Sequence, residues 1–66
     1  MRTYYTLCLW NTDIKSWEDS FGSYSRVEVV EEVEFCGYVK SHCRILHTDG
    51  TAADMIAKRD ALAPRK

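Results

Sequence analysis

The segment from Ser25 to Gly37, SRVEVVEEVEFCG, constrains the fold more than any other part of the chain. Its interleaved valines and glutamates fit a strand with an acidic face, and they equally fit a helix on which Val29 and Val33 belong to an apolar stripe. The flanking residues favour the helix, because Ser25 and Glu28 have the spacing of a capping box and Gly37 is a typical stop. We therefore predict a helix between Ser25 and Gly37, with a strand as the alternative.

Two strands are predicted before this helix. The sequence TYYTLCLW, residues 3–10, is rich in aromatic and β-branched residues and apolar on both faces, which is typical of a central strand. NTDIKS then supplies residues that favour turns. WEDSF alternates Trp17, Asp19 and Phe21 against polar neighbours, which predicts a second strand that ends at Gly22. The first third of the chain should form a β-hairpin.

The second half of the chain adds one strand and one helix. CRILH, residues 43–47, has the composition of a short strand, and the following TDG is typical of a turn. Thr51 and Asp54 repeat the capping pattern at the start of AADMIAKRDALA, which consists largely of good helix formers and is stopped by Pro64. The predicted element order is β-β-α-β-α.

The predicted architecture is a single α+β domain at residues 1–63, followed by a frayed tail at residues 64–66. A right-handed crossover through the first helix places the third strand beside the first. The result is a three-stranded antiparallel sheet of order 2-1-3, with both helices on one face. The opposite face, which carries Tyr4 and Trp10, is left without a cover. Because 66 residues are near the lower limit for a stable core, we expect a homodimer that buries this face.

Charge and hydropathy argue against nucleic acid and membranes as partners. The net charge is −1, with −3 concentrated in residues 26–36 and +3 spread over the residues that follow. A nucleic-acid binder usually has a basic excess, so this hypothesis is the weakest one. Its candidate residues are Arg44, Lys58, Arg59, Arg65 and Lys66. No apolar run approaches the ~20 residues of a membrane span, and no signal peptide is recognisable, so we expect a cytoplasmic protein.

The cysteines and histidines form no pattern typical of catalysis or metal binding. Four residues could be imagined as a zinc site: Cys36, His42, Cys43 and His47. Their spacing lacks the close pairs that preorganise tetrahedral zinc. Nothing in the spacing places an activating group beside a cysteine, so nucleophilic catalysis is not indicated. Glu31 and Glu32 are neighbours on a solvated helical face, which like-charged residues commonly occupy, so they do not indicate a catalytic carboxylate pair. We therefore predict a non-enzymatic protein with free thiols, no metal and no cofactor.

The predicted helix carries a candidate binding surface. At ~100° per residue, Phe35 falls among the carboxylates of Glu28, Glu31 and Glu32. If the helix continues through Phe35, the ring is an exposed anchor with an acidic rim, which suits a basic partner surface. If the helix ends earlier, the ring turns into the core. The sequence leaves both possibilities open.

The segments YYTLCLWNTDIKSWEDSFGSYSRVEV and RILHTDGTAADMIAKRDAL resemble small uncharacterised proteins of bacteriophages and prophages. The resemblance spans most of the chain but implies no defined activity and no functional residues. Compact, acidic-faced inhibitors of host defence, anti-CRISPR proteins included, are a recurrent type among such proteins. The resemblance is therefore consistent with a phage-encoded inhibitor that acts in the cytoplasm of the host cell, without implying that activity.

Two hypotheses of different classes follow. The first is a protein-interaction module that occupies a basic surface of a host protein through its acidic helix. The second is a dimeric domain that binds a small ligand or nucleotide, with Tyr4, Trp10 and Trp17 stacking against a ring in a cleft.

Overall fold

The computed structural model describes residues 2–62. In chain order, the elements are β1 (Tyr4–Asn11), β2 (Ser16–Ser23), α1 (Arg26–Cys36), the short 3-10 helix η1 (Lys40–His42), β3 (Cys43–Thr48) and α2 (Ala52–Asp60). The strands form one antiparallel sheet in the order β2-β1-β3. The predicted α+β class and strand order are confirmed. The predicted boundary after residue 63 and the tail at residues 64–66 lie outside the described part of the chain.

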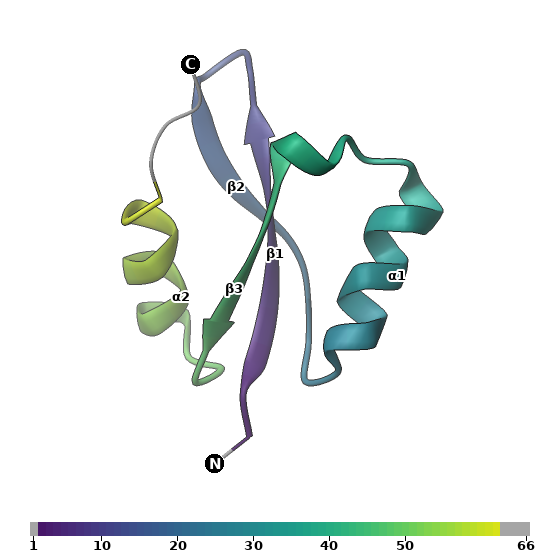
Figure 1. The fold of residues 1–66 in the computed structure, drawn as a ribbon. Coiled ribbons are helices and arrows are strands. Elements are labelled where there is room, and N and C mark those ends of the chain that lie inside the picture. The colour runs from purple at the N-terminus through teal and green to yellow at the C-terminus, as the bar shows by residue number, and fades with distance from the viewer. Residues whose placement is uncertain (1, 63–66) are drawn as a thin grey trace.

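The two α-helices cover opposite faces of the sheet, so the prediction that they share one face is wrong (Figure 1). Leu7 of β1 belongs to a buried cluster with Val33 of α1. Cys8, the next residue of β1, belongs to a second cluster that includes Leu62, just after α2. The physical reason lies in β1 itself: because its side chains are apolar on both faces, each face requires its own cover.

α1 settles the ambiguity of the valine-glutamate segment in favour of a helix. The Ser25 side chain accepts a hydrogen bond from the backbone N–H of Glu28 at 3.4 Å, and Gly37 ends the helix with a φ of 69°. The Glu28 carboxylate does not complete a capping box. It accepts a 2.6 Å hydrogen bond from the hydroxyl of Ser23, which in turn accepts one from the N–H of Ser25 at 3.0 Å. Local capping thus overrides the strand propensity of valine.

A β-bulge in β2 changes which of its side chains share a face. The register skips Ser20, since Leu7 pairs with Phe21 while the next residue of β1 pairs with Asp19. One extra residue reverses the side on which the following side chains point. Phe21 therefore packs against the cluster beneath α1, whereas Trp17 packs on the face of α2. The predicted alternation is wrong at Phe21.

Gly22 is a packing glycine and not the predicted end of the strand, because β2 continues to Ser23. The ring of Tyr4 lies across it, so that a Cβ at this position would come within 2.7 Å of the Tyr4 Cε2 atom. A glycine inside a strand commonly marks such a close approach. The same ring meets Tyr24 edge-on, with 4.9 Å between ring centroids.

Candidate interaction surface

Phe35 lies on the outer side of α1 and is 91% exposed. The helix continues through Cys36, so the alternative in which it ends early and the ring enters the core is excluded. Val29 and Val33 take the buried positions of the helix. A phenyl ring that is exposed to water beside the carboxylates of the same helix buries little of its surface within the fold, which makes it a candidate contact residue.

The three carboxylates predicted to surround the ring do so. Glu28, Glu31 and Glu32 line, together with Phe35 and Phe21, a shallow hollow of about 310 Å³ on the β2 side of α1. The structure therefore brings all four predicted surface residues together. Phe21 was missed by sequence reasoning because its position depends on the bulge in β2, which the alternation in WEDSF does not reveal.

The carboxylates differ in how far the fold already uses them. Glu28 accepts the hydrogen bond from Ser23 and so belongs to the start of α1. Glu32 accepts a weak hydrogen bond from the Cys36 thiol at 3.2 Å. Glu31 is exposed and has no hydrogen bond or ion pair within residues 2–62. Glu31 and Glu32 are therefore the carboxylates most available to a partner.

Tyr4, Trp10 and Trp17 do not form one aromatic cleft. Trp17 is only 5% exposed and meets Trp10 edge-on, with 5.3 Å between centroids. The guanidinium of Arg44 lies 5.0 Å from the centre of the Trp17 ring. Tyr4 instead packs on Gly22 and Tyr24, away from the tryptophans. Because α2 covers this face, the prediction that it lacks a cover is wrong, and the homodimer and the stacked ligand stay predictions.

The basic residues considered for nucleic-acid contact are used within the fold where the structure describes them. Arg44 donates to the carbonyl of Cys43 at 2.8 Å. Lys58 lies 3.1 Å from the carboxylate of Asp54. Arg59 pairs with Asp19 of β2 at 2.9 Å. Arg65 and Lys66 lie outside the described residues. The described members of this set do not gather into one basic patch that faces solvent.

The thiols of Cys8, Cys36 and Cys43 are all free. Burial, helped by the nearby carboxylate of Asp19, raises the pKa of Cys8 to about 11. Burial also raises the pKa of Cys43. Both thiols therefore stay protonated at neutral pH, which suits packing and not nucleophilic chemistry. Within residues 2–62, no three histidine, cysteine or acidic residues are arranged to hold a metal ion.

Comparison with known proteins gives no assignment. No family model matches the chain, and no curated protein or solved structure matches it significantly. In the described part of the chain, every helix is too short or too polar to cross a membrane. The surface around Phe35, through its geometry and charge, is therefore the feature from which a function can be proposed.

Proposed function

We propose that the protein is a non-enzymatic interaction module that binds a basic surface of a partner protein through Phe35 and the surrounding carboxylates of Glu28, Glu31 and Glu32. The observation that carries the proposal is the 91% exposure of Phe35 on a capped helix. Burying such a ring against a partner contributes about 1.5–3 kcal/mol. Aromatic residues that are buried on binding are among the usual anchors of protein interfaces.

The acidic rim defines the charge of the partner. Residues 26–36 carry a net charge of −3, which attracts an arginine- or lysine-rich surface and repels an acidic one. The arginine and lysine side chains of such a partner can also lie over the phenyl ring of Phe35. Surfaces rich in arginine and lysine are typical of proteins that bind nucleic acid, so a partner of this kind fits both elements of the site.

The resemblance to phage proteins supports a more specific form of the proposal. Defence proteins that hold nucleic acid in a positively charged channel have a basic surface of this kind. A phage-encoded inhibitor that acts in the host cytoplasm would bind to that surface. The acidic surface of α1 would occupy that channel in place of phosphates. No catalytic step is needed for inhibition of this kind.

Affinity capture from host lysate tests the proposal with one variant and one matched control. Phe35→Ala should lose the captured partner, because a desolvated anchor typically costs ~2 kcal/mol or more when truncated. Ile14→Ala removes an apolar side chain that is also exposed, at 60%, but lies in the hairpin turn. This control should capture the partner as the wild type does. Equal capture by Phe35→Ala, or a partner with an acidic contact surface, would contradict the proposal.

A further inference from the structure

A second hollow, opposite in charge to the Phe35 surface, lies on the other side of α1, against β3. Its apolar lining comes from Val30 and Val33 of α1 and from Cys43 and Ile45 of β3, and its volume is about 350 Å³. Ligand sites in proteins range over roughly 300–1,000 Å³. This groove is therefore large enough for one or two apolar side chains of a partner.

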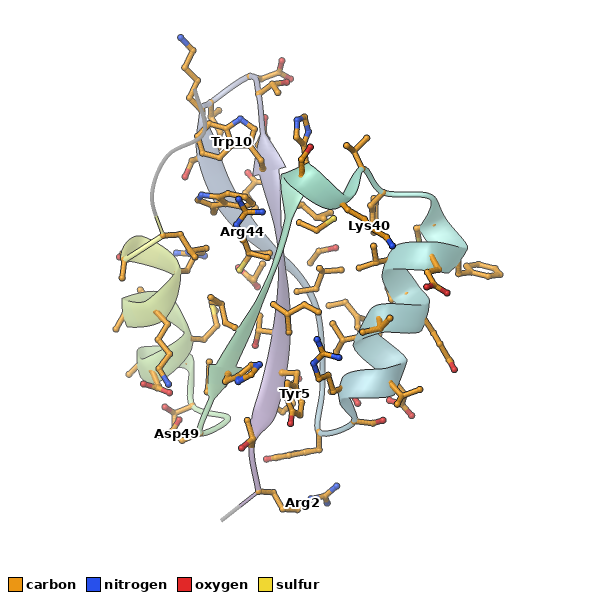
Figure 2. The ribbon with its side chains drawn as sticks, viewed as in Figure 1. Arg2, Tyr5, Trp10, Lys40, Arg44 and Asp49 are labelled. Carbon is orange, nitrogen blue, oxygen red and sulfur yellow. The ribbon has the colours of Figure 1, made fainter. Side chains whose placement is uncertain are left out.

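The rim of the groove is basic. Arg26 and Lys40 line it, one at the start of α1 and the other just beyond its end. Figure 2 shows the side chain of Lys40 extending toward α1. Neither cation has an ion pair or hydrogen bond within residues 2–62. These two cations stand against one carboxylate in the lining, that of Glu34, whereas the guanidinium of Arg44, which also borders the groove, lies over the Trp17 ring. The charge of the groove fits an acidic ligand.

β3 adds an open backbone edge to this groove, since it is an outer strand of the sheet. The carbonyl of Cys43 accepts a hydrogen bond from Arg44 at 2.8 Å, and that of His47 accepts one from Lys58 at 2.6 Å. These carbonyls therefore point away from β1, and the alternation of an antiparallel ladder gives Ile45 the same outward direction. The flexible side chains of Arg44 and Lys58 thus occupy carbonyls with which a further strand would pair. Charged side chains commonly protect edge strands from unwanted pairing in this way.

We propose that this groove binds an extended, acidic peptide segment of another protein, which adds to the edge of β3 as a fourth strand. Its backbone pairs with the outward groups of β3, and one apolar side chain enters the hollow between Val30 and Ile45. Its carboxylates meet Arg26 and Lys40. They also draw the side chains of Arg44 and Lys58 away from the strand carbonyls, which opens the edge to pairing.

Strand addition explains the combination of features better than recognition of charge alone. In this mode, main-chain hydrogen bonds supply affinity and pockets for alternate side chains supply specificity. The acidic strand β2 of a second copy is a poor occupant, because its charges are already engaged. Glu18 accepts a hydrogen bond from Asn11 at 3.3 Å, and Asp19 pairs with Arg59. The segment is therefore expected to come from a different protein.

The test uses ¹⁵N-labelled protein and a short, end-blocked peptide of alternating glutamate and valine as the probe. We expect the largest amide shift changes at Ile45, His47 and Val30, and weaker binding at high salt. A second probe carries N-methyl groups on the amides that would face β3. It keeps the charge and side chains of the first probe but cannot pair with a strand, so its binding should be lost.

A charge-reversal pair of variants separates the groove from the overall charge of the protein. Lys40→Glu should weaken binding of the peptide about tenfold or more, as expected for loss of a close charge pair. Lys15→Glu makes the same change in net charge at an exposed lysine of the hairpin turn and should leave the affinity within about twofold. Equal binding of the N-methylated peptide, equal effects of the two variants, shift changes confined to β2 and α2, or no binding at millimolar peptide would each overturn the proposal.

Discussion

α1 and α2 are attached to the sheet by different forces. α1 buries Val29 and Val33 in the core, and none of its residues forms an ion pair in the described structure. α2 has no fully buried residue, but all three ion pairs within residues 2–62 involve it. A helix that is held by its apolar side leaves its charges without ion pairs. The comparison explains why both candidate binding surfaces lie along α1 and neither lies on α2.

The largest expected effect comes from removing the apolar attachment of α1. Val29→Ala removes two methyl groups from a fully buried side chain and leaves a cavity in the core. It should lower the free energy of unfolding by about 2 kcal/mol, with little dependence on salt. Urea denaturation at low and high ionic strength measures this. A loss below about 0.5 kcal/mol would show that α1 is not held by its core contacts.

The caps of the two helices should have intermediate and similar effects. The side chain of Ser25 accepts from the N–H of Glu28, and that of Thr51 accepts from the N–H of Asp54. Ser25→Ala and Thr51→Ala should each cost about 1 kcal/mol of stability. Amide hydrogen exchange in the first turn of each helix locates the loss. If neither variant speeds local exchange, capping does not define these helix starts.

A smaller effect is expected at the ion pair that links α2 to β2. Arg59→Gln breaks the contact with Asp19, and both side chains are partly solvated, at 26% and 50% exposure. The loss should be about 0.5 kcal/mol at low salt and should shrink as salt is added. Denaturation of wild type and variant across ionic strengths gives this difference. A loss that is independent of salt would mean that Arg59 acts through packing and would remove the contrast with α1.

The smallest expected effect is the response of α2 to acid. Hydrogen bonds from the hydroxyl and N–H of Thr51 hold the pKa of the Asp49 carboxyl below its usual value. The stabilisation is therefore complete above the normal aspartate pKa and is lost as pH falls through the lowered one. NMR titration should show Thr51 and the first turn of α2 loosening in acid. In Asp49→Asn this response should be absent, and its persistence would assign the effect to another carboxyl.

Local signals predicted the elements of the fold, and long-range packing decided their arrangement. Ser25 and Gly37 identified α1 because their effects on the backbone are local. The placement of α2 was missed because an apolar strand requires a cover on each face without specifying which helix supplies it. The bulge at Ser20 was missed because nothing in the residue itself distinguishes a bulged position from a regular one.

The same distinction applies to the candidate surfaces. Helical spacing was enough to gather Phe35 with Glu28, Glu31 and Glu32, since all four lie on one helix. Whether Phe35 was exposed could not be decided, because the answer depended on where the helix ended. The basic groove was not foreseen at all. It joins residues of α1 to Lys40 and β3, which only the tertiary fold brings together.

The bulge at Ser20 makes this residue dispensable for the pairing of β2 with β1. Ser20 is exposed, so many side chains are acceptable there. Deleting it would leave Phe21 paired with Leu7 and Asp19 paired with Cys8, so Trp17 would keep its present face of the sheet. A single in-frame deletion at this exposed position would thus leave the buried and solvated residues of β2 where they are. Evolution of this hairpin should therefore accept both the substitution and the loss of residue 20.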